Sequence, residues 1–100
     1  MAHKVAFRPR AEKDLLDIYE FIASDNPLAA IEFIRRLKQV CHDLEDMPEG
    51  GALREDFAPG VRILVFERRV TIAYRIVKDR VQVLRLFYAG RNTPSAFREN

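Results

Sequence analysis

The sequence predicts a two-layer α+β domain with the element order β-α-α-β-β-β, in which a helical hairpin packs on one face of a small antiparallel sheet. In the first half of the chain, apolar residues recur at helical spacing in two segments that a short break separates. From Val61 onward, the apolar period changes to two in three successive runs, which is typical of strands. The length of 100 residues predicts a single domain, residues 1–100, with one core.

The first half of the chain predicts a short strand and two helices. Residues 3–8 place Val5 and Phe7 on one face of a strand, and Pro9 suits the first turn of a helix, where its missing N–H breaks no hydrogen bond. This helix should end near Ser24, and the second should begin at Asn26-Pro27 and run to about Glu45. We expect the charged residues of the first helix, which are Glu12, Lys13, Asp14, Asp17 and Glu20, on its outer faces. The apolar stripes are Ala11, Leu15, Ile18 and Ile22 in the first helix and Ala30, Phe33, Ile34, Leu37, Cys41 and Leu44 in the second.

The second half predicts a loop and then an antiparallel meander. Residues 48–60 hold prolines and glycines and are expected to form a loop. The β-rich runs are residues 61–66, 70–77 and 81–89, and short polar connections join them. The first strand has no tight turn to its successor, so we expect it at an edge of the meander or beside its last strand.

Composition limits the classes of function. Cys41 is the only cysteine, so no internal disulfide forms, and His3 and His42 lack partners for a zinc site. No metal and no cofactor is expected. The N-terminus becomes charged at once, and no apolar run approaches the ~20 residues of a membrane span. We therefore expect a cytoplasmic protein without a membrane partner.

Charge is distributed unevenly along the chain. The last 43 residues carry nine Lys/Arg and three Asp/Glu, whereas the first 57 carry eight Lys/Arg and twelve Asp/Glu. The net charge of the whole chain is only +2, so this separation predicts a basic surface for an anionic partner.

The basic half contains arginines within or just after its strands. A cluster of guanidinium groups suits phosphate or carboxylate, although a solvated open face of the sheet would explain any single one. Arg62, Arg75 and Arg91 come from segments that we expect to be neighbours. The aromatic residues between them stack on bases or pack in the core, and we favour the core for Phe87 and leave Tyr88 open.

The sequence offers little for catalysis. The basic half contains no histidine, and its carboxylates Glu67, Asp79 and Glu99 fall in turns or in the tail. No nucleophile elbow, phosphate-binding loop or zinc-protease motif is present. Cys41 lies on the apolar stripe of a helix, which favours a buried structural thiol.

Four segments together carry a resemblance to a known family. They are DLLDIYEFIASDNPLAAIEFIRRL (residues 14–37), MPEGG (47–51), GVRIL (60–64) and IAYRIVKDRVQVLRLFYAGRN (72–92). The chain resembles the ParE/RelE toxin superfamily of bacterial toxin–antitoxin pairs over residues 5–92. The resemblance implies the same β-α-α-β-β-β fold that the residue pattern predicts.

The superfamily implies two activities. RelE-like members are ribosome-dependent endoribonucleases with a basic catalytic set, and ParE-like members inhibit DNA gyrase. The resemblance places Arg62 and Arg91 on two basic positions of the nuclease set, which would be the catalytic residues if the chain were a nuclease. Three other positions of that set hold Leu64, Thr71 and Phe97, which cannot serve as acids or bases. These departures favour a gyrase inhibitor without enzymatic activity.

We therefore predict the toxin of a type II toxin–antitoxin system that inhibits DNA gyrase and blocks replication. A RelE-like nuclease that binds ribosome and mRNA, or an inactive homologue that only binds its antitoxin, are the alternatives. The predicted target-binding residues are Arg62, Arg75, Arg85, Tyr88, Arg91, Phe97 and Arg98.

The resemblance also implies a ParD-like antitoxin in a hetero-oligomeric complex. Its unstructured C-terminal segment would fold on binding, with apolar side chains beside the helical hairpin and carboxylates near the arginines. The predicted antitoxin-binding residues are Leu15, Ile18, Tyr19, Ile22, Phe33, Leu37 and Arg75.

Overall fold

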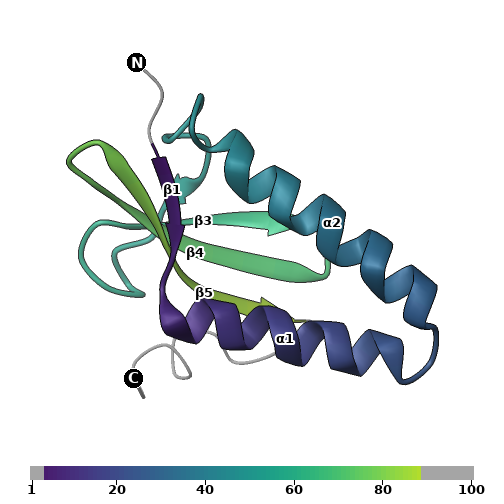
Figure 1. Ribbon diagram of the computed structural model, residues 1–100. Coiled ribbons are helices and arrows are strands. Elements are labelled where there is room, and N and C mark those ends of the chain that lie inside the picture. Colours follow the sequence, from purple (N-terminus) through teal and green to yellow (C-terminus); the bar gives the residue numbers. More distant parts are fainter. Residues whose placement is uncertain (1–3, 89–100) are drawn as a thin grey trace.

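A computed structural model of the chain, which describes residues 4–88, has two helices on one side of a five-stranded sheet (Figure 1). This architecture confirms the predicted α+β fold class, although the sheet is mixed and not wholly antiparallel, because β1 pairs in parallel with β5. The elements are β1 (Lys4–Phe7), α1 (Pro9–Ala23), α2 (Pro27–Asp43), β2 (Ala52–Leu53), β3 (Val61–Phe66), β4 (Val70–Val77) and β5 (Arg80–Tyr88).

The strands follow the order β1-β5-β4-β3-β2 in the sheet. Strands β3, β4 and β5 form the predicted antiparallel meander, and β1 lies parallel to β5 at one edge. The first strand was expected at an edge of the meander or beside its last strand, and β1 lies at an edge beside β5. The two-residue strand β2 was not predicted, because a segment rich in glycine and proline gives no alternating pattern.

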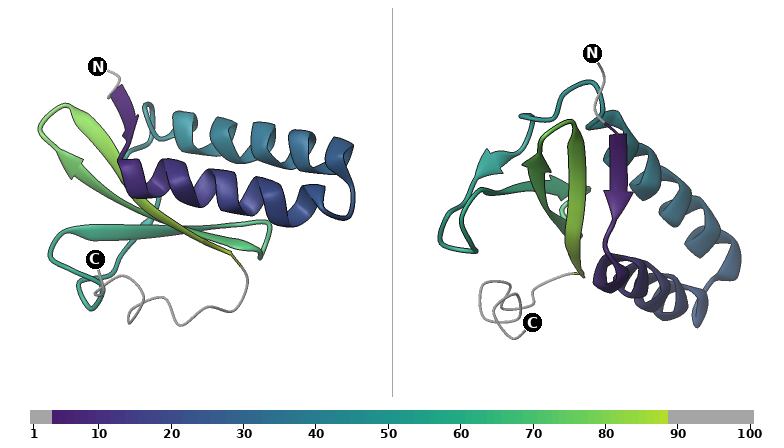
Figure 2. Two further views of the ribbon diagram at one scale, coloured as in Figure 1. Left: turned by 60° about the horizontal axis from the view of Figure 1, so that its bottom comes forward. Right: turned by 60° about the vertical axis from the view of Figure 1, so that its left-hand side comes forward.

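The sequence positions both helix starts. Arg8 is in an extended conformation before Pro9, and Pro9 and Pro27 each occupy the first turn of a helix. The Asn26 side chain accepts a hydrogen bond from the Ala29 N–H at 3.1 Å and so caps α2. The short connection between the helices holds them in an antiparallel hairpin, as Figure 2 shows.

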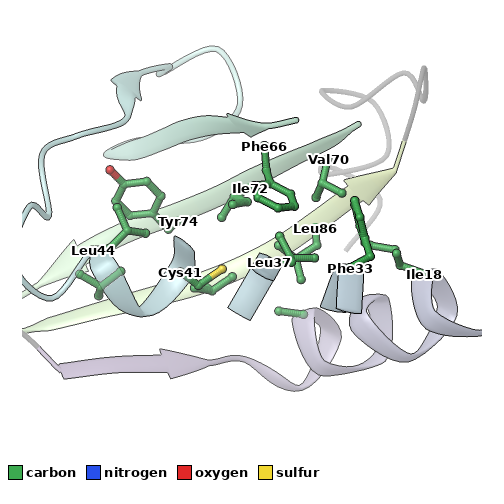
Figure 3. Packing of buried hydrophobic residues seen from close by; sticks show 13 residues of the cluster. Ile18, Phe33, Leu37, Cys41, Leu44, Phe66, Val70, Ile72, Tyr74 and Leu86 are labelled. Atoms are coloured by element: carbon green, nitrogen blue, oxygen red, sulfur yellow. The ribbon is translucent and has the colours of Figure 1, made fainter. Parts of the chain in front are cut away.

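The main core lies between the helices and the sheet. Figure 3 shows Phe33, Leu37 and Cys41 of α2 directed toward Ile72 and Leu86 of the sheet. Val70, Ile72 and Tyr74 alternate along β4 and all point to this helix side. The alternation predicted for the strands thus places one set of side chains under the helical hairpin.

The opposite surface of the sheet, which we call the far face, carries a second and smaller apolar cluster. Its buried members are Phe57, Val61, Ala73 and Phe87. The register between β4 and β5 shifts between Ala73 and Tyr74, as in a β-bulge. This shift reverses the alternation in β5, so Phe87 is buried on the far face, while Tyr88 packs on the helix side.

Neither helix in the described part of the chain is long and apolar enough to span a membrane.

Candidate functional site

The two helices form an open groove of about 490 Å³ on the helical layer. Its lining is mostly apolar, and Leu16 stands 55% exposed beside it. The Phe7 and His42 rings meet edge to face, with 6.1 Å between their centroids. The groove is lined by Phe7, Glu12, Leu15, Leu16, Tyr19, Ile34, Lys38 and His42, and we call it the outer groove.

The outer groove contains only part of the predicted antitoxin-binding set. Leu15 and Tyr19 line it, and Ile22 is half-buried against the core. Ile18, Phe33 and Leu37 are 4%, 2% and 0% exposed because they fill the core under the helices, so the expectation that they form a docking surface is wrong. The lining residues that the prediction missed are Phe7, Glu12, Leu16, Ile34, Lys38 and His42, and the last three recur every four residues along α2.

Arg62 and Arg75, which the sequence placed together, point to opposite faces of the sheet. Arg62 is paired with Tyr74, whose ring lies in the helix-side core, and Arg75 is paired with Val61, which lies in the far-face cluster. Directly paired residues on neighbouring strands share a face. The predicted cluster of these two arginines is therefore wrong, since the strand register separates them.

Arg62 has a local structural contact. Its Nη1 donates a hydrogen bond to the Gly51 carbonyl at 2.9 Å. The Gly51 N–H donates to the Tyr74 hydroxyl at 2.7 Å, and that hydroxyl donates to the Pro48 carbonyl at 2.8 Å. Burial raises the pKa of the Tyr74 hydroxyl, so it remains protonated and keeps both bonds. These contacts fasten the segment before β2 to the sheet.

Arg85 is buried, with 5% exposed, and the expectation that it contacts a target is wrong. Its Nε and Nη2 donate to the Asp14 carboxylate at 2.8 and 3.3 Å, and the Leu86 N–H donates to the same carboxylate at 2.9 Å. Strand β1 ends at Phe7, so no backbone carbonyl of β1 lies opposite the Leu86 N–H. The Asp14 carboxylate of α1 takes the place of that carbonyl as the acceptor. Asp14 is 6% exposed and is not the outer-face residue that the sequence suggested.

A basic surface lies on the far face at the end where β4 turns into β5. Lys4 is paired with Arg80 across β1 and β5, and Arg75 is paired with Gln82 across β4 and β5. The residues between them, Val5, Ile76 and Val81, belong to the helix-side core, so alternation directs Lys4, Arg75 and Arg80 to the far face. With Lys78 of the turn, these residues form what we call the β4–β5 patch: Lys4, Arg75, Lys78 and Arg80.

The β4–β5 patch includes one residue that the sequence selected and three that it missed. Lys4, Lys78 and Arg80 are exposed and Arg75 is half-buried, and none of the four forms an ion pair with another described residue. The patch could not be predicted from the sequence because it depends on the parallel pairing of β1 with β5, which brings Lys4 next to Arg80.

The remaining predicted site residues divide into two groups. Tyr88 is half-buried and lies between the Phe21 and Phe33 rings, at centroid distances of 5.4 and 6.3 Å. Arg91, Phe97 and Arg98 lie outside the described residues. Across residues 4–88, no cluster of three or more His, Cys, Asp or Glu side chains is placed to hold a metal ion.

Comparisons with known proteins give one family match and one matching fold. The family model described as "ParE toxin of type II toxin-antitoxin system, parDE" matches residues 5–93. No curated protein matches the sequence. A solved structure described as "Chromosomal ParDE TA system from P. aeruginosa" has a TM-score of 0.76 and 24% identity, covering 89% of this chain and 98% of that one. At this identity, the structural likeness supports the fold.

Proposed function

The chain belongs to the ParE toxin family of type II toxin–antitoxin systems, and from this premise we propose that it inhibits DNA gyrase and is neutralised by a ParD-like antitoxin. The family match over residues 5–93 carries the proposal. A gyrase inhibitor requires a binding surface but no acid or base. This chain has Leu64 and Thr71 at two positions where the resemblance implies basic catalytic residues in RelE-like nucleases, and its Arg62 is hydrogen-bonded to the Gly51 carbonyl. These features favour a binding role over a catalytic one.

A supercoiling assay with purified gyrase tests the inhibition. The free toxin should block supercoiling and accumulate cleaved plasmid as its concentration approaches that of the gyrase. Full supercoiling activity, without cleaved DNA, at toxin concentrations well above those of the gyrase would contradict the proposal. A mock preparation from cells that lack the gene controls for contaminating nuclease.

We assign the outer groove to the antitoxin. Leu16 is 55% exposed, and Ile31, one helical turn before Ile34, is 45% exposed, so an apolar stripe crosses the groove. Grooves of this kind take an amphipathic helix whose apolar residues recur at three- and four-residue spacing. Glu12 and Lys38 on the lining supply charges of both signs for the polar rim.

Two matched variants test the assignment. Leu16→Arg places a cation in the outer groove and should weaken antitoxin binding by about tenfold or more, since a charge would face an apolar anchor. Leu28→Arg makes the same change at a residue that is 66% exposed and does not line the groove, so it should bind normally. Binding is measured by titration with the antitoxin encoded beside the toxin gene. Equal affinities for the two variants would place the antitoxin elsewhere.

A further inference from the structure

The register of β1 against β5 places two cations side by side on the far face. Lys4 and Arg80 are direct partners in the parallel pair, both are exposed, and neither has an ion pair with a described residue. Like charges directly opposite each other on a sheet destabilise the pairing. An anion that binds above both side chains would relieve this repulsion.

Arg75 extends the basic surface along β4. It lies one row further from the turn, because Arg80 is paired with Val77 and Gln82 is paired with Arg75. Successive rows on one face are about 7 Å apart, at roughly 3.3 Å per residue. Arg75 is half-buried on this face, so its charge lies close to the sheet surface beside the two exposed cations.

The shape of the region favours a chain of negative charges as the ligand. The cations lie in successive rows along a sheet face and do not converge on one point, so a single carboxylate would satisfy only part of them. The turn carries Lys78, which has a left-handed φ of 57° and directs a further cation to the tip. Figure 2 shows that the β4–β5 turn projects beyond the ends of both helices. A projecting two-stranded ribbon of this kind fits the major groove of duplex DNA.

We propose that the β4–β5 patch binds the phosphate backbone of duplex DNA. Lys4, Lys78 and Arg80 contact phosphates from the exposed end of the ribbon, and the half-buried Arg75 adds a fourth positive charge on the same face. Binding is independent of sequence, because contacts to the phosphate backbone carry no sequence information. The inference goes beyond gyrase inhibition, since it concerns DNA in the absence of gyrase.

The test compares two triple variants that lose the same charge. The patch variant is Lys4→Gln/Lys78→Gln/Arg80→Gln, and the control is Arg10→Gln/Lys13→Gln/Arg35→Gln on exposed positions of the helical hairpin. Affinity for a fluorescein-labelled duplex of about 20 bp, enough for two helical turns, is measured by anisotropy at several salt concentrations. Thermal melts of both variants verify that they are folded.

The expected results are specific. The wild-type protein binds the duplex with a negative slope of log K against log salt, and the patch variant binds about tenfold or more weakly with a slope shallower by about three. The control variant keeps the wild-type slope. An equal loss in the two variants, or no binding by the wild-type protein at low salt, would overturn the proposal. Polyglutamate that competes as well as duplex at equal charge would assign the patch to an acidic protein and would also overturn it.

The outcome is separable from that of the proposed function. Gyrase inhibition by a protein that does not bind bare duplex would refute the DNA contact alone. Binding to duplex by a protein that leaves supercoiling unaffected would refute the gyrase inhibition alone.

Discussion

Replacing Asp14 by asparagine should remove a large part of the stability of this domain. The Asp14 carboxylate accepts from Arg85 Nε at 2.8 Å, from Arg85 Nη2 at 3.3 Å and from the Leu86 N–H at 2.9 Å. The side chains of Asp14 and Arg85 are 7% and 5% exposed, so water cannot replace the lost hydrogen bonds. Among residues 4–88, the buried Nη1 of Arg85 already has no hydrogen-bond partner, so these residues offer the guanidinium no alternative acceptor.

The magnitude follows from leaving a buried charge unpaired. Removing one partner of a buried ion pair costs about 3–5 kcal/mol. Asparagine keeps one carbonyl oxygen for either Arg85 or Leu86, so we expect about 3 kcal/mol. For a domain of this size, each 1 kcal/mol lowers Tm by about 4–8 °C, which predicts a fall of about 12–24 °C.

Urea and thermal unfolding of three variants measure the effect. The control Asp17→Asn affects a carboxylate that is 52% exposed and 3.6 Å from Lys13, and it should cost about 0.5 kcal/mol or less. The double variant Asp14→Leu/Arg85→Met removes both charges and should be less destabilised than Asp14→Asn, with a loss of about 1–2 kcal/mol from the unpaired Leu86 N–H. A loss below about 1 kcal/mol for Asp14→Asn would refute the reasoning, because it would mean that the pair is hydrated.

Three further predictions concern groups outside this pair. Tyr74→Phe should cost about 1–3 kcal/mol, because the Gly51 N–H loses its buried acceptor, and hydrogen exchange at Gly51 should accelerate. Burial raises the pKa of the Cys41 thiol to about 12, so alkylation of this thiol at pH 8 should proceed only as fast as the domain opens. Alkylation that is faster than the opening of the domain, in the absence of denaturant, would contradict this prediction. The hydrogen bond from Arg36 lowers the pKa of Glu67, so this carboxylate stabilises the fold above its unfolded pKa. This stabilisation should be lost as the pH falls through the pKa of Glu67 in the folded state. The difference in Tm between the wild type and Glu67→Gln should therefore narrow in acid, and a difference that is constant with pH would refute the prediction.

The secondary structure was predictable because each element satisfies a local rule. The prolines at Pro9 and Pro27 mark both helix starts, and the change of apolar period at Val61 marks the start of the meander. The edge position of β1 was predictable because two helices separate it from the next strand, so no tight turn can pair the two strands. Its parallel direction beside β5 places Lys4 next to Arg80, and that neighbour relation is not visible in either segment alone.

The site was harder to predict because it depends on register and on long-range pairs. A one-residue change of register moves a side chain to the other face of a sheet. Because Arg62 is paired with Tyr74 and Arg75 with Val61, the two arginines lie on opposite faces. The bulge beside Ala73 then reversed the alternation in β5. The sequence predicts a surface position for Asp14 because a carboxylate is rarely buried, although Asp14 lies three residues after Ala11 and four before Ile18 on the buried stripe. Only its partner, 71 residues away, explains its burial.

The two proposed surfaces are connected by β1, and this connection gives a final prediction. Phe7 lines the outer groove and Lys4 belongs to the β4–β5 patch, so they lie at opposite ends of one four-residue strand, about 10 Å apart at roughly 3.3 Å per residue. An antitoxin segment that leaves the groove past Phe7 therefore needs only a few residues to reach Lys4 and Arg80.

If the antitoxin takes this path, it covers the surface that we assign to DNA, and the two ligands exclude each other. Saturating antitoxin should then abolish duplex binding, and the patch variant should bind the antitoxin more weakly at low salt but equally at high salt, where charge is screened. A fragment of the antitoxin confined to the groove should leave duplex binding intact. The decisive measurement uses an antitoxin reduced to its C-terminal segment, so that any duplex in a ternary complex is held by the toxin. Simultaneous binding of that antitoxin and duplex to the wild-type toxin would show that the two surfaces act independently.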